Sequence, residues 1–227
     1  MLDSGDKVSF NILLMRLEGP LQSWGLRSQW DERDTSLIPS KSGIIGLLAC
    51  ALGYKRNDKN IELELSEQLK IGIRIDKQGK IIKDFHTILG RPFTIADGKH
   101  DDRTIVSNRY FIEDGSFLVA IAGEKDLLEK LKKALCNPVW PLYLGRKSCI
   151  PTKPIFDKLT NQYNKFEEAF EQEYWENFFE DEEKEYLMSY IEDEKGTFSQ
   201  PDAIKVTPVR LYGTTNYIPQ KIKLKVN

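Results

Sequence analysis

Three separate stretches of the sequence carry residues that can hold a phosphate group. The first, residues 40–43 (Ser-Lys-Ser-Gly), opens an apolar run at residues 44–52. Free N–H groups at a helix start, two hydroxyls and a lysine suit a single phosphate. Capping of the helix by Ser40 or Ser42 accounts for the same residues. The residue order of a P-loop is not met, because the lysine precedes both glycines. The choice between a phosphate seat and ordinary capping stays open.

The second and third stretches combine cations with aromatic residues. Residues 143–149 (YLGRKSC) place Arg146 and Lys147 directly after a glycine, where backbone and cations can approach an anion closely. A surface turn is the alternative interpretation. Residues 86–111 hold four cations and three aromatic residues: Arg91, Lys99, Arg103, Arg109, Phe93, Tyr110 and Phe111. Such a basic finger has the charge and the stacking surfaces that bind single-stranded nucleic acid.

Catalytic chemistry has few candidates. The two histidines, His86 and His100, form no His-x-x-x-His pair, and the sequence has no G-x-S-x-G motif. Cys50, Cys136 and Cys149 are widely spaced and form no CxxC pair, which argues against a disulfide framework and a cysteine-rich zinc site. The missing P-loop order also disfavours a nucleotide-dependent enzyme. We therefore predict no catalytic residue, no metal site and no cofactor.

Charge is distributed unevenly along the 227 residues, although the formal net charge is only −2. Residues 161–196 contain 13 acidic and 3 basic side chains, and the rest of the chain contains 22 acidic and 30 basic ones. The body is therefore basic and carries one acidic segment. A basic body fits a polyanionic partner, although scattered solvating lysines produce the same excess.

The sequence predicts a cytoplasmic protein without a membrane anchor. Its longest apolar run, residues 44–52, is far too short to cross a bilayer. The N-terminal stretch lacks the basic, apolar and small-residue regions of a signal peptide. An odd number of cysteines fits a reducing compartment.

The periodicity of apolar residues predicts an α+β fold. Strands are expected at 8–17, 71–75, 81–85, 116–122, 203–213 and 221–226, and helices at 40–52 and 124–135. Gly79 is expected to turn a hairpin between 71–75 and 81–85. This order fits one ferredoxin-like βαββαβ domain over residues 1–227 with two insertions, a thumb-like one at 86–111 and an acidic one at 161–196. Helical spacing of aromatic residues in the acidic insertion predicts a helix packed by one face.

Three motifs resemble those of one protein family. The stretches LLMRLEGPLQSWG (13–25), RDTSLIPSKSGIIGLLACALG (33–53) and PLYLGRKSCIPTKPIF (141–156) occur in this order in CasD subunits of type I-E CRISPR Cascade, within the Cas-five family of the RAMP superfamily. Lys147 stands where a second arginine is common in the family. The resemblance extends through most of residues 10–157, and the acidic segment has no counterpart.

The resemblance implies an RRM-like domain with a β-hairpin thumb and a non-catalytic role in antiviral defence. Such a subunit holds the 5′ handle of the CRISPR RNA (crRNA) and caps the backbone filament. Its protein partners are the backbone and large subunits, and target DNA is an indirect partner. The alternative is metal-independent processing of precursor crRNA, as in type I-C relatives. The expected RNA-binding residues are Gln22, Trp24, Arg27, Ser40, Lys41, Ser42, Gly43, Arg91, Arg103, Arg109, Gly145, Arg146, Lys147 and Ser148.

Overall fold

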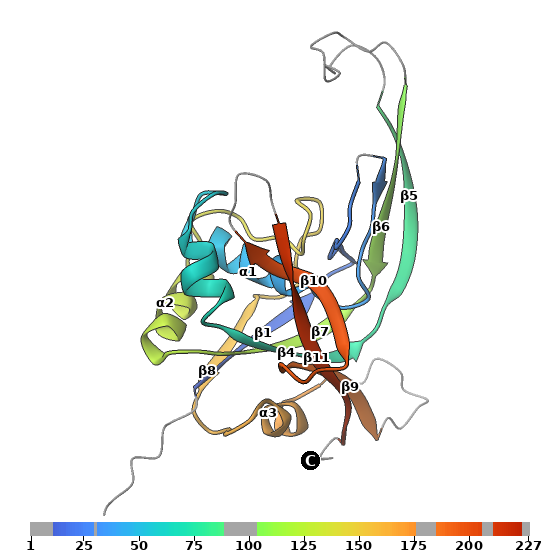
Figure 1. The fold of residues 1–227 in the computed structure, drawn as a ribbon. Helices are drawn as coiled ribbons and strands as arrows, with labels where there is room; N and C mark the ends of the chain where they lie inside the picture. Colours follow the sequence, from blue (N-terminus) through green and yellow to red (C-terminus); the bar gives the residue numbers. More distant parts are fainter. Residues whose placement is uncertain (1–10, 30, 89–103, 176–184, 206–210, 224–227) are drawn as a thin grey trace, which may run out of the picture.

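The computed structural model describes residues 11–29, 31–88, 104–175, 185–205 and 211–223 (Figure 1). Its elements, in chain order, are β1 (Ile12–Glu18), β2 (Leu21–Gln22), β3 (Glu32–Arg33), α1 (Lys41–Leu52), the π-helical turn η1 (Ile61–Ser66), β4 (Lys70–Lys77), β5 (Lys80–Ile88), β6 (Ile105–Glu113), β7 (Ser116–Ala122), α2 (Lys125–Cys136), β8 (Phe156–Thr160), α3 (Phe166–Gln172), β9 (Tyr186–Glu192), β10 (Phe198–Lys205) and β11 (Leu211–Lys223). The α+β class predicted from the sequence is confirmed.

The main sheet has seven strands in the order β10-β11-β9-β4-β7-β1-β8, and each neighbouring pair is antiparallel. One face packs against α1 and α2, and the other packs against α3 (Figure 1). Strand β1 serves both faces, because Leu13 and Met15 belong to the first core cluster and Ile12 and Leu14 to the second. A strand that is covered on both faces needs apolar residues on both, which explains the nearly continuous apolar sequence of β1.

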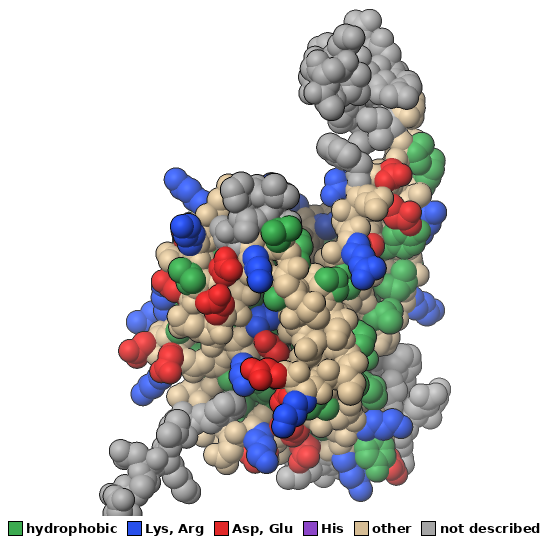
Figure 2. Space-filling view, viewed as in Figure 1, with side chains coloured by type: hydrophobic (Ala, Val, Ile, Leu, Met, Phe, Trp, Pro, Cys, Tyr) green, Lys and Arg blue, Asp and Glu red, His purple; other side chains and the backbone are tan. Residues whose placement is uncertain are grey.

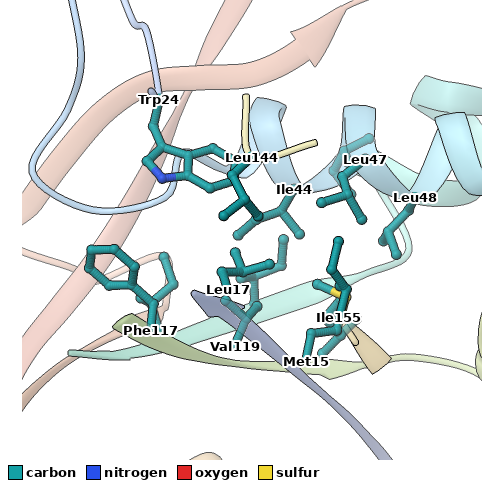
Figure 3. Close-up of a cluster of buried hydrophobic side chains, with 14 of the residues drawn as sticks. Met15, Leu17, Trp24, Ile44, Leu47, Leu48, Phe117, Val119, Leu144 and Ile155 are labelled. Carbon is teal, nitrogen blue, oxygen red and sulfur yellow. The ribbon is translucent and has the colours of Figure 1, made fainter. Parts of the chain in front are cut away.

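Helix α1 begins and ends where the sequence predicts. The hydroxyl of Ser40 accepts a hydrogen bond from the N–H of Gly43 (3.3 Å), and Gly53 ends the helix in the left-handed conformation with φ of 77°. The helix is buried, as its apolar composition indicates. Figure 3 shows Ile44, Leu47 and Leu48 of α1 directed toward Met15 and neighbouring residues of the sheet.

Strands β5 and β6 form a hairpin that projects from the body (Figure 1). Together with the short strands β2 and β3, which both pair with β6, they form a second sheet. The predicted hairpin between 71–75 and 81–85 is wrong, because β4 pairs with β7 and β9 whereas β5 pairs with β6. Burial of Ile71 and Ile73 requires β4 to sit inside the main sheet, and the turn at Gly79 (φ 73°) directs the chain into the other sheet.

The acidic range 161–196 is not one helix, so this prediction is wrong in its second half. Helix α3 occupies its first part, but Tyr186–Glu192 is strand β9, which lies between β11 and β4 inside the main sheet. Alternating burial along β9 is typical of a strand, because Leu187 and Ser189 are buried while Met188 between them is exposed. Residues 176–184 lie outside the described part of the chain.

Buried charges attach α3 to the sheet. The guanidinium of Arg74, fully buried on β4, donates to both carboxylate oxygens of Asp76 and to the carbonyls of Phe170, Glu173 and Tyr174 at the end of α3. A cation at this position satisfies carbonyls that a helix end leaves unpaired. Across the described parts of the chain, no helix combines the length and apolarity needed to cross a membrane.

Candidate nucleic-acid interface

A groove of about 870 Å³ lies beside α1 and gathers residues from all three sequence motifs. Its walls come from the loop around Trp24, the start and outer side of α1, the segment 140–147 and the ends of β10 and β11. Cations and aromatic side chains line it together: Arg33, Arg56, Lys147, Lys205, Tyr54, Trp140, Tyr143 and Tyr212. Charge for phosphates and flat rings for bases are the two features of a groove that binds single-stranded nucleic acid.

The first and third motifs form one continuous wall of this groove. The N–H of Ser23 donates to the carbonyl of Leu144 (3.1 Å). Gly145 has a φ of 88°, and a Cβ atom there would lie 1.7 Å from the carbonyl oxygen of Ser23. Only glycine fits this backbone conformation and this close approach. Gly145 therefore holds the motif 143–149 against the first loop.

Three arginines meet at the base of the hairpin, beside the groove. Arg33 of β3 and Arg109 of β6 are direct partners in the second sheet. Arg146 lies over the ring of Phe111 at 4.7 Å and donates from Nη2 to the carbonyls of Arg33 (2.8 Å) and Asp34 (3.3 Å). Residues from three distant parts of the sequence thus place positive charge at one point.

The arginine cluster has unused hydrogen-bonding capacity. Burial lowers the pKa of Arg146, and the charges of Arg109 and Arg33 lower it further. Nε of Arg109 and Nη1 of Arg146 are buried, and neither has an acceptor among the described residues. Crowded cations with free donors are stabilised by an anion, and a phosphate supplies both negative charge and several acceptor oxygens. The cluster is therefore the strongest candidate for a phosphate site among the described residues.

The expected phosphate seat at the start of α1 is largely taken up by the protein itself. The N–H of Lys41 donates to Oδ2 of buried Asp202 (2.6 Å), and the N–H of Gly43 donates to Ser40. The ammonium group of Lys41 binds Glu192 (2.6 Å) and the carbonyl of Leu69 (3.2 Å). An anionic group does lie at the start of the helix, as expected, but it is the side chain of Asp202 on β10. Capping by Ser40 is the interpretation that the structure supports.

Gln22 and Trp24 lie in the core and offer no surface to a ligand. Gln22 is fully buried and donates to the carbonyls of Leu17 (3.1 Å) and Gly115 (2.7 Å). Its side-chain oxygen accepts from the indole N–H of Trp24 (3.1 Å), whose side chain is 1% exposed. Figure 3 shows Trp24 above Leu17 and near Leu144 and Ile44. The alternative that Trp24 belongs to the core is therefore the one the structure supports.

The other expected residues divide into surface positions and positions that are not described. Arg27, Lys147 and Ser148 are exposed, while Ser42 and Gly43 are partly exposed at the groove. Arg91 and Arg103 lie outside the described residues. The groove residues that the sequence did not single out include Arg33, Tyr54, Arg56, Trp140, Lys205, Leu211 and Tyr212. These residues do not form one sequence motif. They come from four separate segments that only folding brings together.

Among the described histidines and cysteines, only Cys50 lines this groove. Nε2 of His86 lies 2.8 Å from Oδ2 of Asp84 on the hairpin, and His100 is not described. Cys50 does line the groove, but burial raises the pKa of its thiol, which disfavours the nucleophilic thiolate. Within the described ranges no three His, Cys, Asp or Glu side chains are placed to hold a metal ion.

Comparison with known proteins assigns the chain to a family. The family described as CRISPR-associated protein (Cas_Cas5) matches residues 12–216. A relative from Escherichia coli (strain K12), "CRISPR system Cascade subunit CasD", is 34% identical over 155 residues, which cover 63% of this chain and 69% of the relative.

Two solved structures are similar over nearly the whole chain. One is titled "CRISPR RNA-guided surveillance complex" (TM-score 0.76, 28% identity, 94% of this chain and 90% of the other). The second is titled "Crystal structure of Cas protein" (TM-score 0.69, 34% identity, 93% and 95%). The likeness to CasD noted in the three motifs is thus confirmed over a much longer range, and the chain belongs to the CRISPR-associated Cas5 family.

Proposed function

We propose that this chain is a non-catalytic RNA-binding subunit of a Cascade surveillance complex in CRISPR antiviral defence. It holds the 5′ handle of the crRNA and caps the backbone filament beside the large subunit. The observation that carries the proposal is the cluster of Arg33, Arg109 and Arg146, in which Nε of Arg109 and Nη1 of Arg146 are buried without an acceptor among the described residues, while Arg33 lines a groove of cations and aromatic rings. The similarity to a Cascade subunit and to a chain of an RNA-guided surveillance complex supports it.

Within this proposal, each part of the fold has a role. Strands β8-β1-β7-β4 with α1 and α2 constitute the ferredoxin-like core, since their strand order is that of a split βαβ pair. The β5–β6 hairpin is the thumb, and Arg109 marks its base. The handle runs on the α1 side, because α3 packs on the opposite face of the sheet, where an RRM would stack bases.

The alternative function is metal-independent cleavage of precursor crRNA. That reaction needs a positioned base and a cation that stabilises the departing charge. The observation that favours it is the His86–Asp84 pair one strand away from Arg109. The pairing register places His86 on the same face of the hairpin as Arg109, but its imidazole is paired with Asp84 and no described contact joins it to the arginine cluster, so we propose binding without cleavage.

Substitution of the cluster tests the proposal. Arg109→Gln and Lys147→Ala should each weaken binding of a handle-containing RNA oligonucleotide about tenfold in 0.1 M salt. Each should also reduce the slope of log affinity against log salt by about 1 if a phosphate contact is lost. Lys125→Ala, an exposed lysine on α2, is the matched control and should leave both quantities unchanged.

Two results would contradict the proposal. The first is unchanged affinity in both variants, which would remove the arginine cluster and groove as the RNA site. The second is metal-free cleavage of repeat RNA that His86→Gln abolishes, which would favour the processing enzyme instead. Circular dichroism and thermal melting of each variant separate loss of binding from loss of folding.

A further inference from the structure

The groove beside α1 is positively charged throughout its described lining. That lining includes Arg33, Arg56, Lys147 and Lys205 and contains no aspartate or glutamate. Elsewhere the two signs are mixed, and Figure 2 shows acidic and basic side chains interspersed over the body of the molecule. Uncompensated cations in a groove favour a polyanionic occupant.

One end of the groove carries the arginine cluster, through Arg33. Trp24 places this end beside the start of α1. Its N–H donates to Oγ1 of Thr35 (2.9 Å), and its ring lies 2.6 Å from a Cβ atom added at Gly43 in the first turn. The end at Arg33 is thus suited to a phosphate group.

The other end carries two aromatic rings that are attached to the last turn of α1. The N–H of Tyr54 donates to the carbonyl of Ala49 (2.9 Å), and the N–H of Val139 donates to that of Ala51 (3.0 Å). Tyr54 and Trp140, the neighbour of Val139, both line the groove, and Trp140 is 43% exposed. Accessible rings in a basic groove are typical stacking partners of unpaired bases.

Tyr54 is held in position by its hydroxyl group. The hydroxyl donates to Oε2 of Glu64 (2.8 Å) and accepts from Nζ of Lys130 (2.7 Å). A ring that is fixed before binding loses little conformational freedom when a base stacks on it. These contacts therefore prepare the ring for a ligand.

The floor between the two ends is open at Gly46. This residue is exposed, lines the groove, and has no atom within 4 Å of an added Cβ. Glycine is unfavourable inside a helix, and here no described packing contact requires it. Ser42 and Cys50 line the groove on either side, about 12 Å apart at the ~1.5 Å rise of a helix. A strand can therefore pass close to the helix backbone over this distance.

We propose that the end of the groove at Tyr54 and Trp140 is a base-stacking subsite for the RNA strand whose phosphate the arginine cluster binds. The strand crosses α1 over Gly46, and Arg56 neutralises a phosphate beside the stacked base. This inference rests on the proposed function and goes beyond it, because it divides the groove into a phosphate end and a base end.

Length and composition favour a strand over other anionic occupants. A mononucleotide reaches only one end, because about 12 Å corresponds to more than three steps at the ~3.4 Å spacing of stacked nucleotides. An acidic peptide matches the cations, but it brings no base to the two rings.

Affinity for a handle-containing RNA oligonucleotide in 0.1 M salt tests the subsite. Tyr54→Leu/Trp140→Leu should bind at least tenfold less tightly, with an unchanged slope of log affinity against log salt, since no charge is lost. Gly46→Gln should also bind at least tenfold less tightly, although its midpoint of thermal unfolding should not fall. Tyr174→Leu, which removes an exposed ring (71%) beyond the end of α3, is the matched control and should bind normally.

An abasic scan of the oligonucleotide identifies the stacked base. Removal of one base at a time should weaken wild-type binding at least fivefold at one or two positions. At those positions Tyr54→Leu/Trp140→Leu should lose nothing further, because the stacking partner is already absent.

Other outcomes overturn the inference. Normal binding by Tyr54→Leu/Trp140→Leu, together with weak binding by Arg109→Gln, would leave the arginine cluster as the RNA site without a stacking subsite. Adenosine monophosphate that binds as tightly as the oligonucleotide would make this a nucleotide site. A polyglutamate peptide that depends on the two rings more than RNA does would make it a peptide site. Failure of the wild-type chain to bind the oligonucleotide would instead refute the proposed function itself.

Discussion

Single residues of this chain hold the candidate RNA site together without touching a ligand. Gln22 joins β1, the β6–β7 turn and the indole of Trp24 through three buried hydrogen bonds. Gly43 leaves room for the same indole, since a Cβ atom there would lie 2.6 Å from the ring. These residues fix the wall of the groove, and the exposed side chains beside them line the proposed RNA site.

Gly145 gives the sharpest prediction at this scale. Gly145→Ala should lower the free energy of unfolding by about 2–4 kcal/mol, because an alanine is strained at this φ and its Cβ atom meets the carbonyl of Ser23. Urea unfolding monitored by tryptophan fluorescence measures the change.

Gly46→Ala is the matched control for Gly145→Ala. Gly46 lies inside α1, and no atom lies within 4 Å of a Cβ added there. Alanine should therefore stabilise the helix, by up to about 1 kcal/mol. Equal effects of the two substitutions would refute the role given to Gly145.

At the scale of elements, α1 is anchored through its first turn to β9 and β10. Asp202 of β10 accepts from the N–H of Lys41, and the ammonium group of Lys41 binds Glu192 of β9. These contacts replace the ligand that the sequence suggested for this turn. They also connect the groove to strands that lie far along the chain.

Asp202 makes stability depend on pH. Burial raises the pKa of its carboxyl group above the unfolded value of about 3.9. The folded protein therefore binds more protons than the unfolded chain, and the contribution of Asp202 to stability is greatest at low pH. It falls as the pH rises from about 4 through the folded-state pKa.

Asp202→Asn should remove this part of the pH dependence. Urea unfolding of both proteins at several pH values from 4 to 7 gives the difference in stability, wild type minus variant. We expect this difference to be largest at pH 4 and to decrease upward, since other titrating groups cancel in the comparison. A difference that grows with pH would show that the folded-state pKa is lowered instead.

Arg74 is the corresponding anchor for α3. Arg74→Met should cost about 3–5 kcal/mol of stability, because it leaves buried Asp76 with a weaker counter-charge and removes the donor to three carbonyls. The double variant Arg74→Met/Asp76→Leu should recover part of that loss, since no buried carboxylate remains at position 76. Thermal unfolding measures the stability of both variants. If the double variant recovers none of the lost stability, the loss comes from the carbonyl contacts alone.

At the scale of the whole molecule, the central strands β1, β4 and β7 of the main sheet are covered on both faces. Phe166 and Phe170 of α3 pack over Gly72 on one face, and α1 and α2 cover the other. The proposed RNA site is the groove and the base of the hairpin, which lie on the α1 side of the sheet. Helix α3 of the acidic segment therefore packs across the sheet from the proposed RNA site, and β9 of the same segment lies within the sheet (Figure 1).

Deletion of residues 161–196 should consequently prevent folding. It would remove α3 and the internal strand β9, and so separate β11 from β4. We expect insoluble protein, or soluble protein without a cooperative unfolding transition in circular dichroism. Glu167→Gln, which removes one charge of α3 and keeps its packing, should unfold like the wild type. A deletion variant that folds and binds RNA would show that the segment is dispensable.

The sequence by itself determined the elements whose signals are local. The cap at Ser40, the left-handed Gly53, the amphipathic α2 and the apolar strands β1 and β7 depend on neighbours within a few residues. The three motifs also sufficed to indicate the family. The sequence marked Gly145 only as a point of close approach to an anion, whereas in the fold it lies against the carbonyl of Ser23.

Only the tertiary structure decided which charges meet. The acidic composition around β9 concealed a strand that is buried between two others, because tertiary packing overrides local propensity. Asp202 fills the helix start that looked vacant, and Arg33, Arg109 and Arg146 converge from three segments. Electrostatic energy depends on distance in space, and pairs that lie 76 to 161 positions apart along the chain leave no pattern in the sequence.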